Sequence, residues 1–91
     1  MPRFAPAAGS QSLLDERKTT HGDYAKNARI SQAIKLIMRE EADDDMPDIC
    51  RESLEMIALK MSRILSGHWN YADHWDDISG YAKLASEACE E

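Results

Sequence analysis

Two carboxylates one helical turn apart, Glu52 and Glu55, are the residues whose types and spacing most clearly suggest chemistry. Met56 and Leu59 lie nearby, and on a helix at about 100° per residue these side chains share one side. Because large apolar residues share that side, we expect it to be partly covered, and a carboxylate there must be paired or metal-bound. Two carboxylates at this spacing suit Mg²⁺, a hard cation that takes oxygen ligands.

The alternative for these carboxylates is a solvated surface pair. Arg51 precedes Glu55 by four residues, and such a pair on an exposed helix contributes only about 0.2–0.5 kcal/mol. Acidic residues three positions apart are common in helices, so the spacing alone does not separate the two interpretations.

An amide and a group of aromatic residues are the other candidates for ligand binding. Asn27 follows the turn at residues 21–24 (His-Gly-Asp-Tyr) and lies at the edge of an apolar stripe, where an amide must find partners. It either donates to a ligand near this turn or holds the turn as a structural group. Aromatic side chains can stack on bases, or they can supply a small core. Trp75 is assigned to the core, whereas Trp69 and Tyr71 precede its helix and are better placed for a ligand. The predicted substrate-binding residues are Asn27, Tyr24, Trp69 and Tyr81.

Periodicity and capping residues predict an all-α four-helix bundle that positions these side chains. The predicted helices span residues 12–20, 23–41, 46–66 and 74–90, after a loose arm at residues 1–10 and within one domain at residues 11–91. Asp45 or Met46 is expected to cap the third helix, Asp23 the second and Asp73 the fourth. The histidines lie near helix ends, where capping and solvent exposure explain them: His21, His68 and His74.

Each of the three longer helices has an apolar stripe that is expected to face the core. The stripes are Ile30, Ala33, Ile34 and Ile37; Leu54, Ile57, Ala58, Met61, Ile64 and Leu65; and Trp75, Ile78, Ala82 and Ala85. The third helix also carries Met56 and Leu59 on its charged side, so a second helix or subunit is expected to cover them. With the small size of the chain, this predicts a homodimer. Gly80 costs about 1 kcal/mol in mid-helix, which predicts close packing against its backbone.

Composition limits the classes of function. Ninety-one residues form one domain at most, and 17 acidic against 11 basic residues give a net charge of -6, which argues against nucleic-acid and anionic-membrane binding. No stretch approaches the roughly 20 apolar residues of a membrane span. Cys50 and Cys89 lack zinc-binding spacing and are expected to be free thiols in a reducing cytoplasm, with a disulfide as the alternative.

A compound motif combines His-Gly-Asp-Tyr-x-x-Asn at residues 21–27, Lys-Met-Ser-Arg at 60–63 and Asp-x-Trp-x-Asp-Ile-x-Gly-Tyr-Ala at 73–82. This combination resembles a family of small uncharacterised proteins from phages and prophages. The resemblance covers about residues 12–86.

More distantly, the chain is similar to the all-α nucleoside triphosphate pyrophosphohydrolases of the MazG type. Those enzymes hold Mg²⁺ against a triphosphate with Glu-x-x-Glu on one helix and an acidic-x-x-Asp motif on the next. Glu52 and Glu55 match the first motif; Asp73 with Asp76 matches the second with aspartate in place of the usual glutamate, and Asp77 is a further candidate. The metal ligands that the resemblance implies are Glu52, Glu55, Asp73 and Asp77.

The resemblance implies Mg²⁺-dependent binding or hydrolysis of a nucleoside triphosphate to a monophosphate and pyrophosphate. Mg²⁺ would activate a water for in-line attack, and Lys60 or Arg63 would offset charge on the phosphates. The implied catalytic residues are Glu52, Glu55, Lys60 and Arg63. The competing hypothesis is a non-enzymatic helical module with a dimer or partner interface, in which Arg63 bridges to Asp73 or Asp77.

Overall fold

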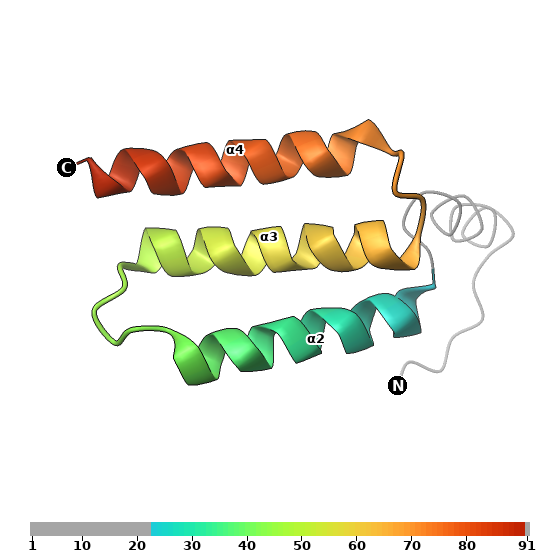
Figure 1. Cartoon of the computed structure of the whole chain (residues 1–91), viewed down its shortest axis with the longest axis horizontal. Helices are drawn as coiled ribbons and strands as arrows, with labels where there is room; N and C mark the ends of the chain where they lie inside the picture. Colours follow the sequence, from blue (N-terminus) through green and yellow to red (C-terminus); the bar gives the residue numbers. More distant parts are fainter. Residues whose placement is uncertain (1–22, 91) are drawn as a thin grey trace, which may run out of the picture.

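Three antiparallel helices in one layer make up the described part of the chain. The structure is a computed structural model that describes residues 23–90, which form α2 (Tyr24–Glu41), α3 (Asp48–Ser66) and α4 (Ala72–Cys89). Figure 1 shows α3 in the middle, with α2 and α4 on either side of it. Over residues 23–90, α2 and α4 each pack against α3 and do not contact each other.

The predicted all-α class is confirmed, whereas the predicted four-helix bundle is not what the described residues form. A bundle needs elements on more than two sides of a shared core, but α3 meets its neighbours only on two opposite sides (Figure 1). The predicted arm at residues 1–10 and the predicted helix at residues 12–20 lie outside the described residues.

The ends of α2 and α3 follow from local sequence signals. The carboxylate of Asp23 accepts a hydrogen bond from the backbone N–H of Ala25 at 3.1 Å, so this residue caps α2 as predicted. Pro47 occupies the N-cap of α3, one or two residues later than predicted, and Asp48 lies in the first turn near the positive helix end. α3 ends at Ser66, where the prediction placed its end.

The start of α4 differs from the prediction. Tyr71, not Asp73, occupies the N-cap, and no side chain caps this helix. Asp73 lies in the first turn of α4 and accepts a hydrogen bond from the hydroxyl of Tyr71. The hydrogen bond and the adjacent negative charge raise the pKa of Tyr71 above its ordinary value. The carboxylate of Asp73 is therefore engaged with a neighbouring side chain.

Small and polar side chains fill the contacts between the helices. Among the described residues, Ala58, 1% exposed, is the one buried hydrophobic residue, and the buried polar residues are Asn27, Ser31, Ser53, Ser62 and His74. Oγ of Ser62 lies 2.6 Å from the Leu59 carbonyl oxygen and 3.2 Å from Oδ1 of Asn27, so its one proton is shared between these two acceptors. The contact with Asn27 joins α3 to α2. These interfaces hold the helices together without a large apolar core.

Three predictions about packing are wrong. Trp75 was expected in the core but is exposed, and His74 was expected at the surface but is buried, because α4 turns His74 and not Trp75 toward α3. Close packing was expected at Gly80, but a methyl group added there would meet nothing within 4 Å. The side of α4 that carries Gly80 is open.

Candidate functional site

Large apolar side chains on all three helices form an exposed surface, which we call the apolar face. Its members are Ile37 of α2, Leu54, Met61 and Leu65 of α3, and Trp75 of α4, all of which are exposed. Spacings of seven and four residues place the three α3 side chains on one side of their helix. The apolar stripes predicted to form the core therefore supply much of the outside of the layer.

Contacts between helices place the outer members on the same side as those of α3. Ile37 and Leu54 line one pocket. On the other flank, Cys50 lies one turn before Leu54 and its thiol contacts that of Cys89. Trp75 precedes Cys89 by fourteen residues, nearly four full turns, so both lie on the same side of α4.

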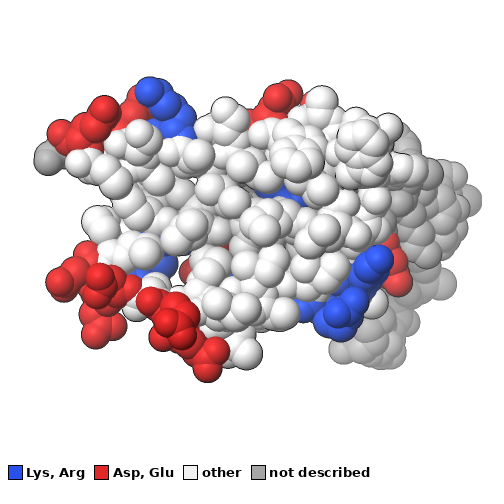
Figure 2. Space-filling model, in the orientation of Figure 1, with Lys and Arg blue, Asp and Glu red and all other residues white. Residues whose placement is uncertain are grey.

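Figure 2 shows this side of the layer. Uncharged atoms extend across the three helices, and the Lys, Arg, Asp and Glu side chains lie mainly at the margins of the view. Leu65 is 59% exposed and Trp75 is 52% exposed, so this side of the molecule leaves much apolar surface uncovered. Contiguous apolar surfaces of this kind mark interaction sites.

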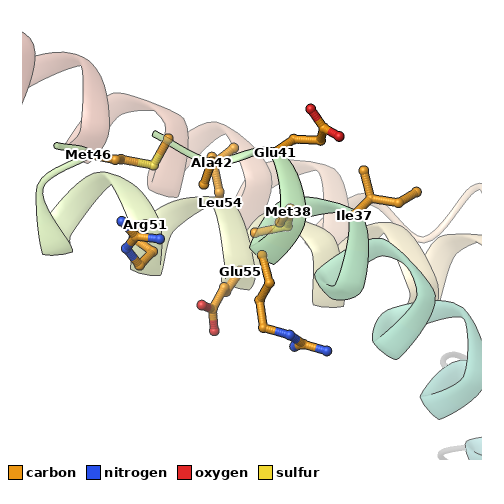
Figure 3. Close-up of a pocket in the computed structure, with 9 residues that line it drawn as sticks. Ile37, Met38, Glu41, Ala42, Met46, Arg51, Leu54 and Glu55 are labelled. Atoms are coloured by element: carbon orange, nitrogen blue, oxygen red, sulfur yellow. The ribbon is translucent and has the colours of Figure 1, made fainter. Parts of the chain in front are cut away.

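A pocket at one end of the layer continues the apolar face. It has a volume of about 300 Å³ and lies between the end of α2, the following link and the start of α3. Figure 3 shows Met38, Ala42, Met46 and Leu54 lining it, while the carboxylate of Glu41 points away. The remaining lining residues are Ile37, Arg39, Arg51 and Glu55. Arg51 donates to the backbone carbonyl of Asp43 at 3.2 Å, which ties the link to α3.

Two of the predicted catalytic and metal-binding residues form an ion pair that joins α3 to α4. Nζ of Lys60 lies 2.7 Å from Oδ2 of Asp77, and the Lys60 side chain is only 12% exposed. The hydrogen bond from Lys60, together with the charges of Lys60, His74 and Arg63, holds the pKa of Asp77 below its ordinary value, although desolvation opposes the shift. These two residues thus neutralise each other, and Arg63 lies close enough to add to the field at Asp77.

The four predicted Mg²⁺ ligands are not brought together. Glu52 is exposed and Glu55 is half-buried. Lys60 pairs with Asp77 and so marks the level of Asp77 on α3. Glu52 lies eight positions before Lys60, which places it about 12 Å along α3 from that level. Asp73 lies one turn before Asp77 on α4 and is still farther from Glu52. Among residues 23–90, no group of three or more His, Cys, Asp or Glu side chains is arranged to hold a metal ion. The four predicted ligands therefore do not form one cluster within residues 23–90, and Mg²⁺ binding stays a prediction.

Three of the predicted substrate-binding residues lie at the same end of the layer. α2 begins near the link between α3 and α4, so Tyr24 and Trp69, both exposed, and the buried Asn27 lie there (Figure 1). The carbonyl of Trp69 accepts a hydrogen bond from Nε1 of Trp75 at 2.7 Å. Tyr81 is half-buried and lies about 14 Å along α4 from its start. Oδ1 of Asn27 accepts the hydrogen bond from Ser62, so this amide is engaged between α2 and α3.

Comparisons with known proteins give one finding. A family model described as a domain of unknown function (DUF6378) matches residues 7–89 of the chain. Neither the curated proteins nor the solved structures contain a match to the chain. Within the described residues, no helix combines the length and apolar character needed to cross a membrane.

Proposed function

Because the chain belongs to the family of domains of unknown function DUF6378, we propose its function from its geometry: it is a helical association module that pairs with a second copy through the apolar face. The single observation that carries this proposal is the exposure of Ile37, Leu54, Met61, Leu65 and Trp75 beside a described core with one buried hydrophobic residue. Burying a side chain of this kind contributes about 1.5–3 kcal/mol, so covering the apolar face stabilises the layer substantially.

The distribution of charge favours a second copy as the partner. The chain carries a net charge of -6, and a like-charged copy can approach only through a surface that keeps the acidic residues apart. The apolar face meets that condition, because its charged side chains lie mainly at the margins (Figure 2). A two-fold dimer uses the same patch on both subunits and would stack one layer of helices on another.

A charge placed on the apolar face tests this proposal. Leu65→Glu should convert the dimer into a monomer, because a dimer interface cannot bury an unpaired carboxylate without a large cost. Sedimentation velocity gives the mass, and circular dichroism gives the helical content of each variant. Leu84→Glu is the matched control, because Leu84 is 49% exposed but does not belong to the apolar face. Leu84 follows Trp75 by nine residues, which places it on the opposite side of α4.

The oligomeric states of the two variants decide whether the apolar face is the dimer interface. A monomeric Leu65→Glu variant with native helical content, beside a dimeric Leu84→Glu variant, supports the proposal. Met61→Glu is the second test on the same face if Leu65→Glu fails to fold. A monomeric wild-type chain, or a dimer that survives both charges on the apolar face, contradicts it.

The resemblance to phage proteins and to MazG-type enzymes makes nucleoside triphosphate binding or hydrolysis the second candidate. The observation that favours it is that Glu52 is exposed and Glu55 half-buried, one turn apart on α3, with Glu52 on the side of the helix away from Leu54 and Met61. The carboxylate of Glu52 would stay accessible in the proposed dimer. Glu55→Gln should abolish Mg²⁺-dependent pyrophosphate release from a triphosphate, and Glu40→Gln on α2 should not. Equal release by wild type and Glu55→Gln would exclude this role.

A further inference from the structure

We infer that Cys50 and Cys89 are a modification site: the two thiols close into an intramolecular disulfide on exchange with a small-molecule disulfide such as oxidised glutathione. The disulfide would join the start of α3 to the end of α4. This inference does not depend on the proposed dimer.

The helical hairpin formed by α3 and α4 brings the two cysteines level with each other. Cys50 lies seventeen residues before Gly67 and Cys89 lies seventeen residues after Ala72, on either side of a short link. The 2.7 Å ion pair between Lys60 and Asp77 fixes the register of the two helices. Cys50 lies about 15 Å along α3 from Lys60, and Cys89 lies about 18 Å along α4 from Asp77. The two cysteines are therefore within one helical turn of the same level.

The surroundings of the two thiols differ in a way that sets the order of reaction. Cys50 is half-buried and Cys89 is exposed, and neither is in a disulfide. Burial and then the adjacent Cys89 thiol, which contacts it, raise the pKa of Cys50 above its ordinary value. The exposed thiol is therefore the one that a dissolved disulfide reaches first, with the second thiol already beside it.

The exchange proceeds in two steps that balance. The Cys89 thiolate attacks one sulfur of oxidised glutathione, which forms a mixed disulfide and releases one glutathione thiolate. The Cys50 thiolate then attacks the Cys89 sulfur and expels the second glutathione. The protein loses two electrons and two protons, and one molecule of oxidised glutathione becomes two of the reduced form.

The structure indicates what this bond would change. In the described part of the chain α4 packs only against α3, and Cys89 is its last residue, so the end of this helix has little to hold it. A bond to Cys50 closes the hairpin at its open end and restricts the unfolded chain. The oxidised protein should unfold at a temperature about 10 °C higher or more.

The test is a redox titration of the full chain. The protein is equilibrated in mixtures of reduced and oxidised glutathione, quenched with acid, alkylated and digested, and the peptides are identified by mass spectrometry. The expected product is a monomer on a denaturing gel without reductant, in which a Cys50 peptide is joined to a Cys89 peptide. The unfolding temperature should rise with the oxidised fraction.

Single variants separate this result from ordinary thiol reactivity. Cys50→Ser should stop at a glutathione adduct on Cys89, and Cys89→Ser should react more slowly at the half-buried Cys50. The inference is overturned if the wild type accumulates stable glutathione adducts on both cysteines, or if its only disulfides join two chains. It is also overturned if the titration leaves both thiols reduced at every ratio tested.

Discussion

At the scale of single residues, the ion pair between Lys60 and Asp77 should make stability depend on pH. The pairing holds the pKa of Asp77 in the folded protein below its ordinary value of 3.8. A carboxyl group with a lowered pKa stabilises the fold fully above pH 3.8, and that contribution is lost as the pH falls through the lowered value. We expect Asp77→Asn to lower the unfolding temperature near neutral pH and to have progressively less effect below about pH 4.

Thermal denaturation from about pH 7 to about pH 3 measures this difference. Glu87→Gln is the control, because Glu87 pairs with Lys83 at 3.9 Å with both side chains exposed, and exposed pairs contribute little. A difference between wild type and Asp77→Asn that stays constant over the whole range would show that the ion pair is not the source of the pH dependence.

Roles that depend on a residue's own turn of helix could be predicted only in part, because Asp23 caps α2 as expected whereas Asp73 does not cap α4. Asp23 could be assigned as a cap because capping involves backbone groups two residues away. The roles of Lys60 and Asp77 could not, because each is decided by the side chain opposite it on another helix. The proximity of Cys50 and Cys89 could have been predicted, because the two cysteines lie at equal distances from the link of a predicted helical hairpin.

At the scale of single helices, the open side of α4 predicts that replacing Gly80 with alanine stabilises the protein. Nothing lies within 4 Å of the position that an added methyl group would take. Alanine is favoured over glycine inside a helix by about 0.8–1.0 kcal/mol. Gly80→Ala should therefore raise the unfolding temperature by about 4–8 °C, as measured by differential scanning calorimetry.

Ser79→Ala, at the neighbouring exposed position of α4, is the control for helix propensity alone. It should give a smaller rise, because serine is a better helix former than glycine. A fall in the unfolding temperature of Gly80→Ala would instead show that another helix or subunit packs against this side of α4.

The helices themselves could largely be predicted, whereas their arrangement could not. Periodicity located α2 and α3 within one or two residues, and it identified Leu54, Met61 and Leu65 as one apolar side. Periodicity shows which side of a helix is apolar but not what covers it. The residues buried where the helices meet are small or polar, such as Ser62 and Ala58, and the large apolar side chains of α3 are left outside.

At the scale of the whole molecule, a single layer of helices cannot bury both of its surfaces. The described layer buries one hydrophobic residue, and its apolar face is uncovered. A small domain with so little core is marginal alone. Association therefore adds to the stability of the proposed dimer, which links folding to protein concentration.

This linkage predicts an unfolding temperature that rises with concentration. For a dimer that unfolds directly to two chains with ordinary enthalpy per residue, each tenfold increase in concentration should raise the midpoint by about 4–5 °C. Calorimetric scans over a hundredfold range of concentration measure the slope. Leu84→Glu should keep the slope of the wild type, since its charge lies off the apolar face. Leu65→Glu should unfold at a lower and concentration-independent temperature, because a monomer gains nothing by mass action. A wild-type midpoint that does not move with concentration would mean that the layer is stable alone, and the apolar face would then need another partner.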